Sequence, residues 1–401
     1  PLASNYDADA KKDDGSCLYE NANATEYIDM GNNITRVVDH GEGTGTMTWT
    51  SDKTWLLDGF VFINNGQTLT IEAGTVVKGK EGQGSDASAM IVARGGMIMA
   101  EGTANNPIIF TYENDDVNSA TDVPTGTRGK WGGLIILGKA RTNTVPAEKA
   151  IEGIPTTEPR GTYGGTDDAD NSGVIRYVSL RHGGTDIGAG NEINGVTFGA
   201  VGSGTTVEHI EVAYNADDGV EWFGGTVNCK YLVSALNGDD CFDYDEGWRG
   251  QGQFWFAIQD AAEGDRGGEH DGGTDPETGT PYATPRIWNA TYIGQGEPAN
   301  KRAVTFRDNA GGEYHNSIFT EWGKGIDIEL LASGDDSYDR YVGGDLKLAN
   351  NIFWNVAGNN SAKLFSISTG SGTSALDSTA ASNDIIAYYT TAGNQVLNPG
   401  I

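Results

Sequence analysis

Two similar stretches, IEVAYNADDGVEWF (210–223) and LVSALNGDDCFDYD (232–245), begin 22 residues apart in the chain. An Asn and two Asp residues coincide in them, at 215 and 237, 217 and 239, and 218 and 240. After each Asp-Asp pair, apolar and polar residues alternate, which is typical of a strand with one buried face and one outer face. The offset therefore predicts a repeated coil that adds one strand per turn to the same sheet.

The same alternation continues in other parts of the chain. The first inward column is Val196, Val220, Phe242, Val304 and Ile326; the second is Phe198, Trp222, Tyr244, Phe306 and Ile328; the outward residues between them are Thr197, Glu221, Asp243, Thr305 and Asp327; and a further outward column is Phe223, Asp245, Arg307 and Glu329. The 62-residue gap between Phe242 and Val304 is expected to hold one more coil, with a long insertion around GDRGGEHDGG (264–273).

Every coil runs in the same sense, so the strands must be parallel, and the crossover rule gives the handedness. The sequence therefore predicts an all-β, right-handed parallel β-helix, a solenoid, over residues 45–371. Long loop insertions interrupt it at 112–130, 141–173, 183–193, 260–285 and 294–302. Loops on a rigid scaffold are where binding surfaces are usually built.

Composition excludes several classes of function. The 401 residues include 59 Gly and only 11 Pro, which suits many tight turns between short strands. The formal charge of −30 disfavours nucleic acid and anionic lipid as partners and favours cations, Ca²⁺ above all. No run of 18 apolar residues occurs, so no membrane span is expected. The oligomeric state cannot be predicted.

The two ends differ from the repeat. Residues 1–24 are expected to be an Asp-rich linker or a fragment of a small disulfide or calcium module, in which Asp7, Asp9, Asp13 and Asp14 are candidate Ca²⁺ ligands. Residues 372–401 are expected to be a C-terminal cap or the start of a linker. Cys229 and Cys241 lie in one coil, where pairing and non-pairing both remain open.

The main body resembles a family of secreted or surface-anchored β-helix proteins of Bacteroidota. The resemblance lies in IEAGTVVKG, ANNPIIFT, WGGLIILGKA, YGGTDDADNSGVIRYVSLRHGG, DDGVEWFGGTVN and GDDCFDYDEGW. NYDADAKKDDGSC (5–17) is similar to short Asp-rich repeats of surface proteins in the same phylum, in which the Cys pairs with an earlier one. These resemblances imply an extracellular or outer-membrane-surface location and a fold, but no established activity.

A narrower resemblance is to polygalacturonase-type glycosidases. Asn215-Ala-Asp-Asp-Gly219 and Gly238-Asp-Asp240 match two of their turns, one coil apart, whereas their GHG and RIK motifs are missing.

Glu221 and Asp243 are the central candidates, because neighbouring coils place them roughly 4.8 Å apart on the outer face. Three interpretations follow: a general acid/base pair on a glycosidic bond, a Ca²⁺ site completed by Asp245 or a loop oxygen, or a solvated acidic face. In an enzyme, His270 from the 260–285 insertion would join the pair. The turn carboxylates at 217, 218, 239 and 240 are expected to bond to the turn backbone.

Further candidates are assigned to ligand binding. Asp271 belongs to the same insertion as His270, and His182 and Glu192 are expected to flank the acidic face. Phe223, Trp248 and Trp255 form either a stacking platform for a sugar ring or packing beneath a loop. The leading hypothesis is thus a non-enzymatic extracellular β-helix that binds carbohydrate or another surface component with Ca²⁺ support. The alternatives are a polysaccharide-degrading glycosidase or lyase and a purely structural stalk or surface-layer unit.

Overall fold

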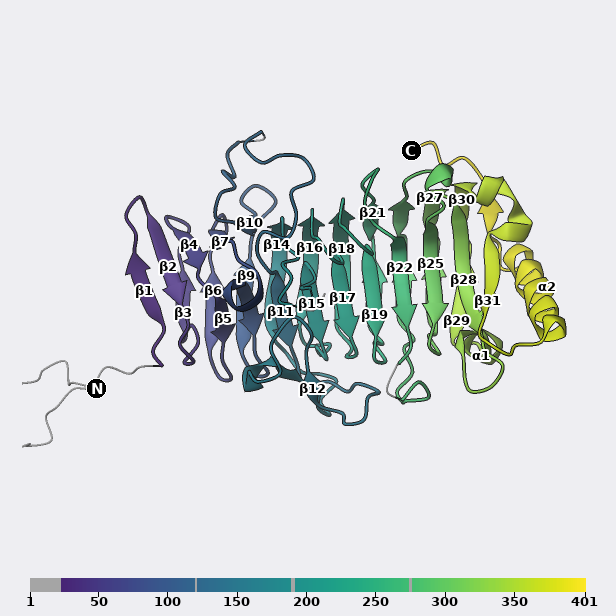
Figure 1. Cartoon of the computed structure of the whole chain (residues 1–401), viewed down its shortest axis with the longest axis horizontal. Helices are drawn as coiled ribbons and strands as arrows, with labels where there is room; N and C mark the ends of the chain where they lie inside the picture. Colours follow the sequence, from purple (N-terminus) through teal and green to yellow (C-terminus); the bar gives the residue numbers. More distant parts are fainter. Residues whose placement is uncertain (1–22, 120, 189–191, 274–275) are drawn as a thin grey trace, which may run out of the picture.

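The chain forms a parallel β-helix, in which successive coils stack along one long axis (Figure 1). This is a computed structural model that describes residues 23–119, 121–188, 192–273 and 276–401. Within those ranges the strands form one 20-stranded sheet, one 10-stranded sheet and a short two-stranded sheet. The predicted fold class is confirmed.

The large sheet supplies two sides of the coil. Its strands are β1 (Glu26–Asp29), β2 (Ile34–Val38), β3 (Met47–Trp49), β4 (Thr54–Leu57), β6 (Thr68–Ile71), β7 (Val76–Gly79), β9 (Met97–Glu101), β10 (Ile108–Tyr112), β14 (Gly173–Arg181), β16 (Thr206–Ala213), β18 (Asn228–Ala235), β20 (Gln251–Gln253), β21 (Phe256–Ile258), β23 (Arg286–Trp288), β24 (Thr291–Ile293), β26 (Gly312–His315), β27 (Ile318–Trp322), β29 (Leu346–Ala349), β30 (Ile352–Val356) and β32 (Gln395–Val396).

The 10-stranded sheet, called sheet B below, forms the remaining side. Its strands are β5 (Phe60–Ile63), β8 (Ala89–Val92), β11 (Leu134–Leu137), β15 (Val196–Gly199), β17 (Val220–Phe223), β19 (Phe242–Asp245), β22 (Arg266–Asp271), β25 (Arg302–Arg307), β28 (Lys324–Leu330) and β31 (Phe365–Thr369). Its register confirms the predicted columns, since Val196 pairs with Val220, Val220 with Phe242, and Val304 with Ile326. The expected extra coil is present as β22, in which Gly268 pairs with Val304.

A corner divides the two sides of the large sheet. At that corner the backbone takes the left-handed conformation, with φ between 50° and 60° at Tyr177, His209, Tyr231, Phe254, Asn289, Asn316 and Asn350. Asn tolerates this conformation better than most residues, whereas an aromatic residue there carries strain. The first four coils of the series nevertheless place an aromatic ring at the corner.

The interior is filled by the inward columns and closed at the corners by asparagine ladders. Trp222 stacks on Trp248 and Trp255, with ring centroids 4.6 and 5.1 Å away. The backbone N–H of Asn215 donates to Asn237 Oδ1 over 2.8 Å, and Asn351 N–H donates to Asn394 Oδ1 over 3.0 Å. Such bonds satisfy buried backbone groups from one coil to the next.

Helices are few in the described ranges. They are α1 (Ser337–Gly343), α2 (Ala375–Thr391) and the 3-10 turns η1 (Gly84–Asp86), η2 (Pro159–Gly161), η3 (Glu297–Ala299), η4 (Ala357–Asn359) and η5 (Ser361–Lys363). Helix α2 lies across the last coil at the C-terminal end (Figure 1) and buries Ile385 and Tyr389 in the core. The weakly patterned C-terminal segment thus covers the open end of the solenoid. At the other end, β2 already pairs in parallel with β4, so stacking starts before residue 45.

The 141–173 insertion folds back over the outer face of sheet B. It contains β12 (Lys149–Ala150) and β13 (Thr162–Tyr163), which pair with each other. Its side chains meet outward apolar residues of the sheet in a second buried cluster, which comprises Phe62, Ala89, Ile91, Ala93, Ile135, Leu137, Ile151, Ile154, Tyr163, Ile193, Ala200 and Phe223. The insertion therefore buries the apolar part of the outer face of sheet B.

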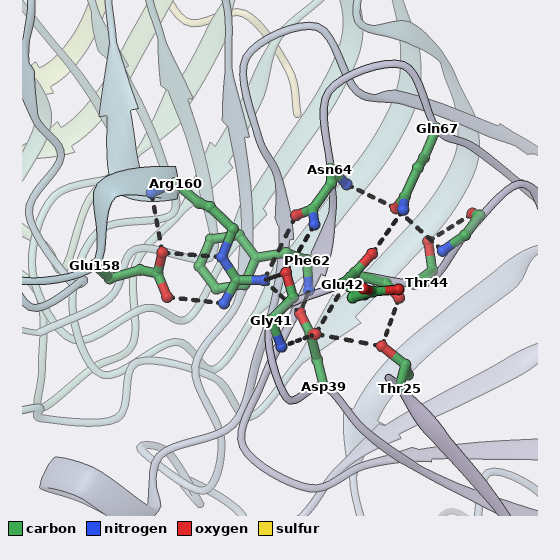
Figure 2. Close-up of polar contacts among 12 residues, drawn as sticks. Thr25, Asp39, Gly41, Glu42, Thr44, Phe62, Asn64, Gln67, Glu158 and Arg160 are labelled. Carbon is green, nitrogen blue, oxygen red and sulfur yellow. Dashed lines mark hydrogen bonds and ion pairs between the residues drawn. The ribbon is translucent and has the colours of Figure 1, made fainter. Parts of the chain in front are cut away.

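Arg160 fastens this insertion to the first coils (Figure 2). Its guanidinium lies 3.8 Å from the centre of the Phe62 ring and 2.7 Å from Asp39 Oδ2. Glu158 holds the same guanidinium from the other side at 2.7 Å. The Asp39 side chain is completely buried, and its oxygens also accept backbone N–H groups of Gly41 and Phe62.

Candidate functional site

The outward column of sheet B that contains Thr197 becomes acidic at strand β17. Glu221 pairs in register with Asp243, and Asp243 with Glu269, so the predicted neighbours are confirmed as neighbours. Carboxylate oxygens of Asp218, Glu221 and Asp243 all lie within 4.8 Å of one another. A second group of the same kind, Asp217, Asp218 and Asp239, shares Asp218 with the first.

Asp218 belongs to the corner that precedes β17. Its Oδ1 accepts the backbone N–H of Asp240 in the next coil at 2.9 Å, and Asp240 Oδ1 accepts the N–H of Arg266 one coil further on. The expectation that these Asp residues bond to turn backbone is thus met at 218 and 240, although each bond reaches the following coil. The corner fixes Asp218 beside the strand that carries Glu221.

Glu152 of the 141–173 insertion and Asn194, two residues before β15, cover this position. The Asn194 side chain, which is 1% exposed, donates from Nδ2 to Glu221 and to Glu152 Oε1, the latter over 3.0 Å. Glu152 comes from the 141–173 insertion and also shares a hydrogen bond with Glu221. Glu221 is consequently 7% exposed, so the face around it is covered and is not an open groove.

We call Glu152, Asp217, Asp218, Glu221 and Asp243 the carboxylate cluster. Within the described residues, Asp217, Asp218, Glu221 and Asp243 form no ion pair with Lys, Arg or His. Glu269, one coil further on, differs because Arg266 and Arg307 hold it at 2.9 and 2.8 Å. Glu221 and Asp243 are therefore positions of the acidic column without an ion-pair partner among the described residues, whereas the charge of Lys149 acts on Glu152.

Burial and mutual repulsion decide the protonation of the cluster. Burial, followed by the charge of Glu152, raises the pKa of Glu221 well above its usual value. Burial, followed by the charge of Asp218, does the same to the pKa of Asp243. Burial raises the pKa of Asp217 to about 7, with Glu152 and Glu192 contributing. Carboxyls this close either share protons or hold a cation between them.

The donor set fits a hard cation. Asp218, Glu221 and Asp243 offer carboxylate oxygens, and Asp243 Oδ1 is buried without a hydrogen-bond partner among the described residues. Asn194 Oδ1 is buried and equally unpartnered. Ca²⁺ takes six to eight oxygen ligands of these types, so several positions would fall to water or other oxygens.

The expected position of His270 is wrong. His270 lies on strand β22, in the inward column between Tyr244 and Phe306, and its side chain is fully buried. Its Nε2 lies 2.7 Å from the Tyr314 hydroxyl, and burial lowers its pKa to about 3. A neutral imidazole inside the coil does not reach the acidic face.

The prediction of an exposed aromatic platform at Phe223, Trp248 and Trp255 is also wrong. Trp248 and Trp255 are 0% and 1% exposed and form part of the interior stack. Phe223 does face outward, but it is buried against Tyr163 of the insertion, with ring centroids 6.2 Å apart. The interpretation of loop packing therefore holds for Phe223, and none of the three rings offers a free face.

The other candidates separate into two places. Glu192 lies near the cluster, where its charge contributes to the raised pKa of Asp217. His182 lies elsewhere, beneath the 112–130 loop, where its Nδ1 is 2.8 Å from Thr127 O and its ring stacks on Tyr214. These contacts place the His182 ring against that loop, and none of them is with a member of the carboxylate cluster.

Asp245 and Asp271 occupy the second outward column. Burial, followed by the charge of Glu246, raises the pKa of Asp245 to about 7. Asp271 is held by Arg307, with Nε 2.6 Å from Oδ1. Asp7, Asp9, Asp13 and Asp14 lie outside the described residues. Cys229 and Cys241 are buried free thiols, so the pairing that was left open is not formed.

Sequence reasoning missed Glu152 and Asn194. Glu152 lies in an insertion that has no repeat partner. Asn194 lies two residues before Val196, at the position that Asp218 and Asp240 take in the next coils, but it is an amide among acidic residues. The signal that was available is indirect, namely an acidic column that continues beside a long insertion.

These features define a parallel β-helix with a covered carboxylate cluster on one outer face. Residues 41–394 match the family model described as a pectate-lyase-like β-helix domain, and the chain belongs to that family. Neither the curated proteins nor the solved structures gave a match. In the described ranges, no helix combines the length and the apolar character that a membrane span requires.

Proposed function

We propose that the protein is a non-enzymatic β-helix that acts outside the cell and binds carbohydrate, with a Ca²⁺ ion supporting the fold at the carboxylate cluster. The observation that carries the proposal is an exposed aromatic surface on the corner of the large sheet. Its rings are those of Tyr177, His209, Tyr231 and Phe254, called the aromatic corner, with Trp288 in the adjoining column.

The rings of the aromatic corner form one stack. Centroids are 4.2 Å apart from Tyr177 to His209, 4.4 Å from His209 to Tyr231, and 5.1 Å from Tyr231 to Phe254. Tyr231 and Phe254 are each 42% exposed. Left-handed backbone at aromatic residues is strained, and later coils place Asn there instead, which supports a functional reason for the rings.

Beside the stack lies a hollow of about 450 Å³, lined by Asn228, Lys230, Gln251, Gly252, Gln253 and Trp288. Trp288 is 40% exposed, and His315 of the next coil covers one face of its indole at 4.3 Å. The other lining residues lie in preceding coils, so the second face of the indole borders the hollow. An aromatic face beside amide side chains is the chemistry that binds the apolar face and hydroxyls of a sugar.

The enzymatic alternative has weaker support. Asn194 and Glu152 lie over Glu221, and the only His assigned to the reaction is inside the coil. A substrate would have to displace both cover residues before it met the carboxylates.

The test is binding of the full chain to a panel of neutral and acidic polysaccharides with Ca²⁺ present. Trp288→Ala is expected to weaken binding about tenfold, equivalent to ~1.4 kcal/mol. Val342→Ala is the matched control, because Val342 is an exposed apolar residue on α1. Equal affinity of the two variants, or release of shortened saccharides by the wild type, would contradict the proposal.

A further inference from the structure

A second hollow, of about 460 Å³, lies at the C-terminal end of sheet B. Strands β25, β28 and β31 and the 3-10 turns that follow β30 surround it, and its lining is Arg302, Gly323, Lys324, Asp327, Ala357, Lys363, Ser366, Ile367 and Ser368. Asp327 belongs to the same outward column as Glu221 and Asp243. The column that is acidic in the middle of the sheet thus ends, at Asp327, among the cationic side chains of Arg302, Lys324 and Lys363.

The lining carries three cationic side chains and one carboxylate. Asp327 is already compensated, because Arg302 NH1 lies 2.7 Å from its Oδ1 and the Ser366 hydroxyl donates to the same oxygen over 2.6 Å. Lys324 and Lys363 are exposed, and within the described residues neither ammonium has a carboxylate partner. The hollow is therefore locally cationic in a chain of formal charge −30.

Two of these cations are placed directly against each other. Arg302 and Lys324 are partners in the register of β25 and β28. Like charges at such positions destabilise a sheet, and an anion between them reverses the sign of that interaction. The contacts of Arg302 with Asp327 and Ser366 both use NH1, so in the described part of the chain its other N–H donors remain available.

Hydroxyl and guanidinium donors complete the set. Ser368 follows Ser366 at the next outward position of β31, and both line the hollow. Arg presents several N–H donors in a fixed plane, which suits the oxygens of carboxylate and sulfate groups, and Lys adds point charges. A volume of this size accommodates more than a bare ion.

We propose that this hollow binds the anionic oxygens of a small carboxylated or sulfated ligand. The inference goes beyond the proposed function, because the site is on sheet B at the end of the solenoid and does not include the aromatic corner. Lys324 and Lys363 supply the attraction, and Arg302 with the Ser368 hydroxyl directs the oxygens, while Ser366 holds Asp327 and Arg302 in place. Binding weakens as salt rises, since exposed charges are screened.

The experiment is calorimetric titration of the full chain with sodium sulfate, sodium glucuronate and glucose at low ionic strength. Saturable binding is expected for at least one of the two anions and not for glucose. If sulfate binds and glucuronate does not, the source is a sulfated ligand; the reverse result assigns a carboxylated one. The double variant Lys324→Gln/Lys363→Gln is expected to weaken binding at least tenfold.

Two further variants keep the inference falsifiable. Lys53→Gln removes the same charge from an exposed Lys near β4, at the opposite end of the molecule, and is expected to bind like wild type. Ser368→Asp places a carboxylate in the hollow and is expected to abolish binding while the melting temperature stays within a few degrees of wild type. Absence of saturable anion binding, equal binding by the double variant, or glucose binding as tight as glucuronate overturns the inference.

Discussion

The two halves of the outer face of sheet B have the same backbone and opposite chemistry. At one outward position, successive coils carry Ile91, Ile135 and Thr197, and the next coils carry Glu221 and Asp243. The 141–173 insertion covers the apolar half with Ile151, Ile154 and Tyr163, and its Glu152 reaches the first carboxylate. An outward position in a solenoid is therefore exposed or buried according to what an insertion places over it.

The largest effect is expected when a carboxylate is introduced into the apolar half of the outer face. Ile135→Asp places a single carboxylate at a fully buried position inside an apolar cluster. The free energy of unfolding is expected to fall by more than about 4 kcal/mol, because a buried unpaired charge is among the costliest changes. Chemical denaturation at pH 7 measures it.

The matched control is Leu376→Asp, which makes an acidic residue at a position that is 79% exposed. Its unfolding free energy is expected to change by less than ~0.5 kcal/mol. If Ile135→Asp were equally mild, the insertion would not cover the apolar half in solution.

Ca²⁺ is expected to bind only at the acidic half of sheet B and thereby to raise the unfolding free energy of the protein. A ligand that binds the folded state at 100 times its Kd adds about 2.7 kcal/mol to the unfolding free energy. Wild type should therefore melt higher with Ca²⁺ than with EDTA in differential scanning calorimetry. Glu221→Gln/Asp243→Asn is expected to lose most of this increment, whereas Asp86→Asn, at an exposed acid in another coil, should keep it. An increment of the same size in all three proteins would exclude the cluster as the site.

The smallest expected effect is a pH dependence of the protein without divalent cations. The folded pKa of Asp217 is about 7 and its unfolded value is near 4, so the folded state binds the proton more tightly. The stability is fully present below about pH 4 and decreases as the pH rises to 7. Asp217→Asn is expected to remove roughly 2 kcal/mol of this decrease, measured by urea unfolding between pH 4 and 7. Asp86→Asn should leave the decrease in place, and an unchanged slope in Asp217→Asn would mean that this carboxyl is not held protonated.

The repeat and the register of sheet B were predictable because they depend on local alternation and on turns that recur. Val220 and Phe242 align on sequence alone, and the structure pairs them. The position of His270 was not predictable in this way, because its strand places Gly268 and His270 in the two inward columns. Small and polar residues at inward positions conceal a strand from any search for apolar alternation.

The carboxylate pair was also predictable, but its surroundings were not. Register alone brings Glu221 beside Asp243, whereas burial depends on how Glu152 and Asn194 fold over them. Trp248 and Trp255 were misplaced for a related reason, since both lie outside the aligned columns and fill the interior from short segments between strands. Long-range packing of unrepeated segments leaves no periodic signal in the sequence.

The contact between Arg160 and Asp39 joins residues that are 121 positions apart in the chain. In a solenoid each coil normally touches only its neighbours, so coils can separate from an end one after another. The insertion connects the first coils, through Asp39 and Phe62, with strand β17, through Phe223. Fraying of the N-terminal coil must therefore also open a cover that lies over several later coils. This arrangement converts a series of nearest-neighbour steps into one cooperative unit at that end of the molecule.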